Sequence, residues 1–282
     1  MKAEINNDPF IFRWKVSEAG YRWAKGMDGK PHLVPRLEPG KRIKPIDLPK
    51  TAFAEFARLH ATEEKIRGFA DKYGDLDNTY SVQDCVVHGG VTSLGASLKT
   101  WQSAIEDVRV LFDLWDNIQN RRIAELKKVI RWEKTKDGDS SVSYLLKTST
   151  RERDQMLAHS RLSEGALIRF ADDKGTLLAA RCALREEINL RLSEQPTVPC
   201  LAWTPDYDER IIFKPPHLLA AMWLQFAQAV TGEFGIKRCL CGKFIQTGPG
   251  GKRADVDTCS PACRQRKKRE SRNNLALKRD TP

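Results

Sequence analysis

The sequence lacks the long apolar runs that mark exported and membrane-spanning proteins. Residues 1–8 carry charged and amide side chains and no apolar core of the kind that a signal peptide needs. The most apolar stretch, residues 218–230, is interrupted by Gln225 and Gln228 and falls short of the roughly 20 residues that cross a bilayer. The sequence therefore predicts a cytoplasmic protein without a transmembrane helix.

Complete catalytic motifs are also missing. Residues 248–252 are similar to a phosphate-binding loop, but Gln246 stands where the first glycine is needed, and Arg253 stands where a serine or threonine would hold magnesium. The run His88-Gly89-Gly90 is similar to an oxyanion-hole loop, yet no Gly-x-Ser-x-Gly nucleophile motif accompanies it. These departures predict that the chain is not an enzyme.

A hydrolytic site stays open as the alternative. Asp84 and His88 lie near Cys85 in the sequence, and Asp255 and Asp257 lie near the last cysteines. Histidines give this alternative little support, because none of them shows the spacing of metal ligands. They are His32, His60, His88, His159 and His217.

Most of the cysteines are grouped in two close pairs near the end of the chain. Cys239 and Cys241 are separated by seventeen residues from Cys259 and Cys263. Four thiolates within reach of one ion suit Zn²⁺, which prefers soft, tetrahedral ligation. We therefore expect one structural zinc ion bound by all four. The single residue between Cys239 and Cys241 is a tighter gap than is usual, so ligation by both stays open.

The other three cysteines are scattered. In a reducing cytoplasm they are expected to be small buried apolar residues rather than disulfides, ligands or reactive thiols. They are Cys85, Cys182 and Cys200.

Positive charge is concentrated in the same C-terminal segment. Residues 236–282 hold six lysines and seven arginines against four acidic residues, a net charge of +9 out of +11 for the chain. Ser260 is a favourable N-cap and Pro261 suits a first helical position, so a basic helix is expected to start at the cysteines. Such charge favours a nucleic-acid partner, with a solvated tail as the alternative. The candidate phosphate-binding residues are Lys252, Arg253, Arg264, Arg266, Lys267, Lys268, Arg269 and Arg272.

Three segments are expected along the chain, and together they predict an α+β fold that is mainly helical. Residues 1–50 should form short strands and turns, ending in a proline-containing connector over residues 36–50. Residues 51–235 should be helical with small hairpins. Residues 236–282 should form a zinc knuckle with the arrangement of a treble clef, docked on the helical part because almost no linker separates them.

Apolar residues at helical spacing define the helices of the middle segment. The clearest stripe should continue as helix through residues 120–128; its members are Leu98, Trp101, Ile105, Val108, Phe112 and Trp115. Further helices are expected over residues 62–73, 177–192 and 218–230, and hairpins over residues 130–146 and 200–213.

The cysteine segment resembles a known bacterial family. The pattern Cys259-Ser260-x-x-Cys263-x-x-Arg266, after a helix that leads to Lys237-Arg238-Cys239, is similar to the CGNR zinc-finger proteins. In that family the finger follows a helical ABATE-type domain, and the likeness here extends over residues 51–272. The family's Gly-Asn after the last cysteine is replaced by Arg264-Gln265. The resemblance implies zinc ligation by the four cysteines and a DNA-binding role in transcription regulation.

Three functions remain open on the sequence. The first is a DNA-binding regulator whose helical domain senses an unknown small molecule or a protein partner. The second is a protein–protein adaptor in which zinc only holds the C-terminal helix in place. The third is an RNA-binding protein, because the basic segment has too few aromatic residues for base stacking to distinguish RNA from DNA.

Overall fold

The computed structural model describes residues 12–26, 28–36, 40–41, 43–76, 95–134, 140–147, 152–156, 172–203 and 209–279. Asp84, Cys85, His88 and His159 lie outside these residues. None of the helices in the described part of the chain has the length and apolar character needed to span a lipid bilayer.

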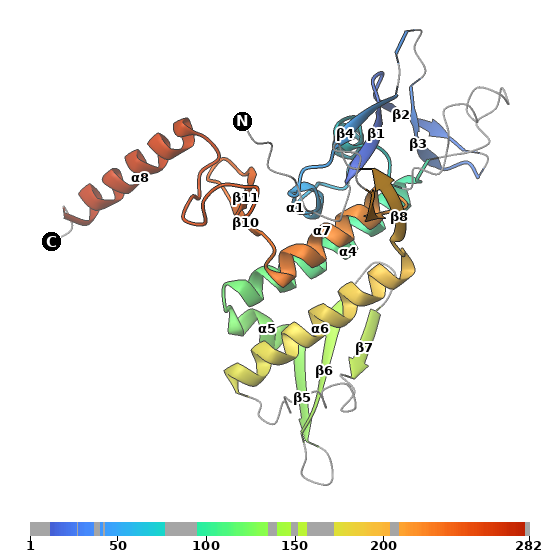
Figure 1. The fold of residues 1–282 in the computed structure, drawn as a ribbon. Coiled ribbons are helices and arrows are strands. Elements are labelled where there is room, and N and C mark those ends of the chain that lie inside the picture. The colour runs from blue at the N-terminus through green and yellow to red at the C-terminus, as the bar shows by residue number, and fades with distance from the viewer. Residues whose placement is uncertain are drawn as a thin grey trace.

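A group of packed helices forms the body of the molecule (Figure 1). Helix α4 packs against α1, α6 and α7, and α6 also packs against α5. The bounds are α1 (Ala52–Ala57), α2 (Glu63–Tyr73), α4 (Leu98–Gln119), α5 (Ile123–Val129), α6 (Asp173–Glu194) and α7 (Leu218–Thr231).

Helix α4 follows directly from its apolar stripe. Ser97 caps its N-terminus, where its Oγ accepts a hydrogen bond from the backbone N–H of Thr100 at 3.1 Å. The predicted stripe from Trp101 to Trp115 is buried, as the spacing requires, and Leu98 at its start is partly buried. The expected helix is therefore confirmed.

Aromatic side chains from three helices meet around Phe226 of α7. Its ring is 5.1 Å from that of Phe53 in α1, and it lies 5.8 Å and 6.2 Å from the rings of Trp115 and Phe112 in α4. Rings at these separations attract one another beyond the burial of their apolar area. This cluster joins α1, α4 and α7.

The strands form small antiparallel sheets, as expected for an α+β protein. The pairs are β1–β4, β2–β3, β8–β9 and β10–β11, and β5, β6 and β7 form a three-stranded sheet. The bounds are β1 (Arg13–Ser17), β2 (Tyr21–Lys25), β3 (Pro31–Pro35), β4 (Ile43–Asp47), β5 (Ile130–Lys134), β6 (Ser140–Lys147), β7 (Glu152–Met156), β8 (Val198–Trp203), β9 (Glu209–Lys214), β10 (Gly235–Arg238) and β11 (Phe244–Thr247).

The connector expected over residues 36–50 contains a strand. Strand β4 pairs with β1, and Pro45 lies opposite Lys15 in the register. Proline has no backbone N–H and cannot donate a hydrogen bond to a neighbouring strand. Its presence therefore favours a connector over a central strand. In a sheet of two strands, however, each strand has a free edge, so Pro45 is tolerated.

The helix expected to continue through residues 120–128 is interrupted. Helix α4 ends at Gln119, and α5 begins only at Ile123. Arg121 lies between them with a φ of +49°, in the left-handed region where a right-handed helix cannot continue. No glycine marks the break, so it could not be predicted from the residues around it.

The expected segments share one hydrophobic core. Val16 and Leu33 from the N-terminal strands are buried with the helical residues, as is Phe234, which lies just before β10. Phe244 of β11 is partly buried against the same cluster. The strands at both ends of the chain are thus packed onto the helices.

Truncation of Phe226 tests the aromatic cluster. Phe226→Ala should lower the free energy of unfolding by about 3–5 kcal/mol, because a fully buried ring is replaced by a cavity. Leu201→Ala is the control and should change it by about 0.5 kcal/mol or less, because Leu201 is 68% exposed. Urea unfolding followed by circular dichroism measures both, and equal effects would contradict the assigned core.

Candidate metal centre and basic helix

The first cysteine pair lies on the turn between β10 and β11. The backbone N–H of Cys239 donates to the carbonyl of Lys243 at 2.9 Å, and that of Gly242 donates to the carbonyl of Cys239 at 2.8 Å. Gly242 has a φ of +88°, which a glycine adopts without strain. This tight turn leaves Cys239 buried and Cys241 exposed, with both sulfurs on the same side of the hairpin as the second pair.

The second pair brackets the start of α8 (Pro261–Arg279). Cys259 lies two residues before the helix, and Cys263 lies in its first turn. The Oγ of Ser260 accepts a hydrogen bond from the backbone N–H of Cys263 at 3.3 Å. The predicted N-cap and first helical proline are therefore confirmed, and the positive end of the helix dipole favours thiolate there.

The four sulfurs form one cluster in which all lie within 4.8 Å of one another. The Sγ atoms of Cys241 and Cys259 are 3.3 Å apart, and those of Cys259 and Cys263 are 3.5 Å apart. Disulfide sulfurs are about 2.05 Å apart, so these are separate thiols. Ligands roughly 2.3 Å from a tetrahedral ion lie about 3.8 Å from one another. The cluster is thus close enough to hold a metal ion, and the tight Cys239/Cys241 gap does not prevent it.

The thiols of Cys239 and Cys259 have strongly shifted pKa values. Hydrogen bonds from the backbone N–H groups of Cys241 and Cys259 lower the pKa of the Cys239 thiol to about 6. Hydrogen bonds with the thiols of Cys241 and Cys263 raise the pKa of Cys259 to about 12. Without a cation the cluster therefore favours a thiolate at Cys239 and a protonated Cys259. A bound metal ion must displace protons from the remaining thiols.

The loop between the cysteine pairs folds back onto β11. Gly251 lies so close to Gln246 that an added Cβ would be 2.7 Å from its carbonyl oxygen. The Nζ of Lys252 then donates to the carbonyls of Thr258 at 3.0 Å and Cys259 at 2.6 Å. Lys252, predicted to contact phosphate, thus has its ammonium engaged inside the module.

The other predicted phosphate-binding residues lie on or beside α8. Arg266 pairs with Glu270 through Nε and Oε1 at 2.9 Å, and Lys267 pairs with Asp257. Arg253 pairs with Asp255, from Nε to Oδ1 at 3.2 Å. Exposed side chains include those of Arg264, Lys268 and Arg269. The side chain of Arg272 lies outside the described residues.

The module is attached to the helical core through β10 and β11, whereas α8 extends away from it (Figure 1). The ring of Phe244 lies 5.8 Å from that of Phe112 in α4, nearly perpendicular to it. The ammonium of Lys50 lies 5.2 Å above the ring of the buried Phe234. These contacts agree with the expected docking.

Among the residues that the structure describes, the remaining candidates take no part in the cluster. Cys182 is buried in the core, as predicted, and Cys200 is half-buried. His32 bonds to Asp28 and to the carbonyl of Gly95, and His217 caps α7 by accepting from the N–H of Ala220. His60 is exposed.

Sequence reasoning missed the structural roles of Lys252 and Asp257. The two aspartates near the cysteines were considered for hydrolysis, but the carboxylates of Asp255 and Asp257 are held in ion pairs with basic residues. Asp257 and Lys267 are ten residues apart, one before α8 and one within it. Their ion pair therefore cannot be predicted from helical spacing. Helical spacing could have identified only the Arg266–Glu270 pair.

Comparison with known proteins identifies no relative. Protein-family models, curated proteins and solved structures were each searched, and none matches the chain.

Metal content tests the cluster. Purified protein should contain one divalent metal ion per chain, and Cys259→Ser should lose it because one of the four sulfurs is removed. Cys200→Ser is the matched control and should retain the ion. Elemental analysis measures the content, and a metal-free wild-type protein with an ordered cluster would contradict the assignment.

The affinity for the metal should fall as the pH falls. The Cys239 thiol, with its pKa near 6, is largely ionised at pH 8 and half ionised at pH 6, whereas Cys259, with its pKa near 12, must release its proton to the solvent throughout this range. Each proton released on binding changes the affinity by about tenfold per pH unit. Competition with a chelator of known affinity measures this slope, and a pH-independent affinity would count against thiol ligation.

Proposed function

We propose that the protein is a zinc-containing DNA-binding protein that acts as a bacterial transcription regulator. The observation that carries this proposal is the gathering of four thiols at the start of an exposed, strongly basic helix. Helix α8 contains eight lysine and arginine residues and one acidic residue. Two of the four cysteines, Cys259 and Cys263, lie on either side of its first residue.

Zinc is the metal that suits the cluster best. Four cysteine sulfurs gathered within 4.8 Å of one another are typical of structural zinc sites. Such sites are closed, because protein ligands fill every coordination position and leave none for a substrate. The metal would therefore hold the β10–β11 turn against the start of α8 rather than take part in a reaction.

The charge and shape of α8 suit a nucleic acid. The helix has almost no apolar residues and cannot be stabilised by burial, so its side chains are available to a partner. A single helix fits the major groove of duplex DNA, and lysine and arginine are the usual contacts to its phosphates. The likeness to CGNR zinc fingers favours DNA over RNA. In this proposal the helical core supplies a sensing or partner-binding part.

One observation favours an adaptor as the second candidate. The hairpin β8–β9 exposes large apolar side chains, among them Leu201 and its cross-strand partner Ile211, which are 68% and 62% exposed. Trp203 on the same strand is also 68% exposed. Exposed apolar groups of this size are common where proteins bind one another.

Substitution of three basic residues distinguishes these functions. The salt dependence of wild-type binding to a fluorescent DNA duplex should give a slope of about −4.5 in log K against log salt, for roughly five phosphate contacts. Changing Arg266, Lys267 and Lys268 to alanine should reduce the slope by about three and weaken binding at least about 100-fold at 0.1 M salt. Fluorescence anisotropy over a salt series measures both.

The same variant provides its own folding control. It should keep its metal and its melting temperature, because all three side chains lie on the exposed helix. Unchanged affinity for DNA would refute the proposed contact surface and favour the adaptor. Tighter binding of the wild-type protein to single-stranded or duplex RNA of the same sequence would instead indicate an RNA-binding protein.

A further inference from the structure

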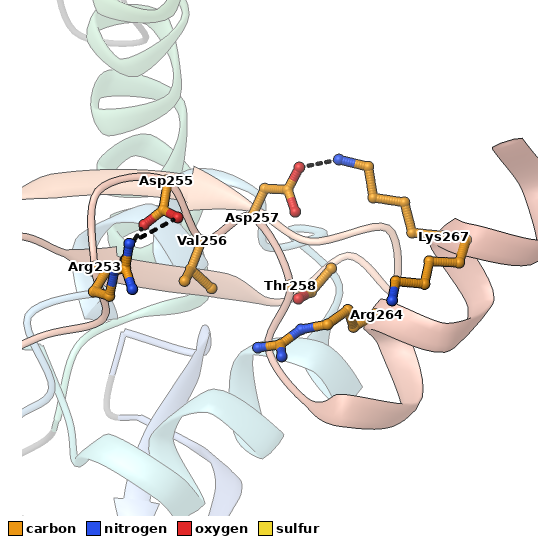
Figure 2. Close-up of a pocket in the computed structure, with 8 residues that line it drawn as sticks. Arg253, Asp255, Val256, Asp257, Thr258, Arg264 and Lys267 are labelled. Carbon is orange, nitrogen blue, oxygen red and sulfur yellow. Dashed lines mark hydrogen bonds and ion pairs between the residues drawn. The ribbon is translucent and has the colours of Figure 1, made fainter.

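A cleft of about 710 Å³ opens beside the first two turns of α8 (Figure 2). One wall is the loop of residues 253–258. The other is a single face of the helix, carrying Arg264, Lys267 and Lys268. Residues three and four apart on a helix project from the same side, so the three basic side chains converge on the cleft.

Both walls are tied to the cysteine cluster. The carbonyls of Thr258 and Cys259 accept hydrogen bonds from Lys252, and Thr258 is buried. On the helix side, Ser260 caps the turn that contains Cys263. The backbone where the two walls meet is therefore held by hydrogen bonds next to the cysteines.

Charges in the cleft are only partly compensated. Asp255 pairs with Arg253, and Asp257 pairs with Lys267, as the dashed lines in Figure 2 indicate. Arg264 and Lys268 have no acidic partner in the part of the chain that the structure describes. Among the described residues, the cleft thus has two basic side chains without an ion pair, Arg264 and Lys268, beside Lys267, which is paired with Asp257.

We infer that, among the basic residues of α8, those that line this cleft make the strongest contact with a backbone phosphate of the nucleic acid, and that Asp257 takes the place of that phosphate when no nucleic acid is bound. This rests on the proposed function. Carboxylate and phosphate oxygens accept the same charge-assisted hydrogen bonds from an ammonium group. A phosphate contacts Arg264 and Lys268, competes with Asp257 for Lys267, and is repelled by the Asp257 carboxylate.

Paired substitutions on the two sides of α8 test the location. The double variant Arg264→Gln with Lys268→Gln removes two positive charges that line the cleft. The double variant Arg266→Gln with Arg269→Gln removes two from the same turns that do not line it. Binding of a fluorescent DNA duplex at 0.1 M salt should weaken at least about tenfold more for the first variant than for the second. Equal losses, or a larger loss for the second, would overturn the cleft as the phosphate site.

Substitution of the carboxylate tests the role of Asp257. Asp257→Asn should strengthen binding by about fivefold, because one repelling charge beside the phosphate is removed. Glu270→Gln is the matched control: it makes the same change in the net charge of the module but frees Arg266, which lies outside the cleft. The control should change the affinity less than about twofold. Weaker binding by Asp257→Asn, or equal gains from both variants, would overturn the competing role of Asp257.

The wild-type protein separates failure of this inference from failure of the proposed function. If wild type binds neither DNA nor RNA at 0.05 M salt, roughly the low end of such titrations, the proposed function fails and the inference fails with it. If wild type binds and the matched variants behave alike, only the inference fails. Metal content and circular dichroism of each variant establish that its module is folded.

Discussion

Repulsion among clustered thiolates is the constraint on which the C-terminal module depends. Sulfur atoms 3.3–3.5 Å apart cannot all be ionised without a cation between them, and the raised pKa of Cys259 beside the thiols of Cys241 and Cys263 reflects that conflict. A metal ion removes the conflict and at the same time joins a turn, a loop and a helix start. Little apolar area is available in this module to hold them together by burial.

The module gains its position from the helical core. Helix α7 contributes Phe226 to the aromatic cluster and is followed after three residues by β10. Phe112 touches both Phe226 and Phe244, so one side chain of α4 connects the cluster to the hairpin that carries the first cysteine pair. Packing of aromatic rings holds the hairpin, and a metal ion bound by the four sulfurs would in turn hold the start of α8.

Features with a local cause could be predicted from the sequence, and features that depend on distant partners could not. The stripe of α4, the cap at Ser260 and the close spacing within each cysteine pair each depend on residues that are near one another in the sequence. Strand β4 exists because β1 lies beside it, although its proline suggested a connector. The hydrogen bonds of Lys252 and the ion pair of Asp257 with Lys267 form only when the loop and the helix meet. From their charge alone, both lysines are predicted to contact phosphate.

Helix α8 is attached to the module at its first turn (Figure 1), beside the cysteine cluster, so it acts as a lever. It is 19 residues long, so at 1.5 Å per residue its far end lies about 28 Å from a pivot at its start. A tilt of about 10° at that pivot moves the far end by about 5 Å, roughly one helical turn. Small changes in the β10–β11 turn, which rests on the helical core through Phe244, would therefore be amplified into displacements as large as the spacing between successive phosphates.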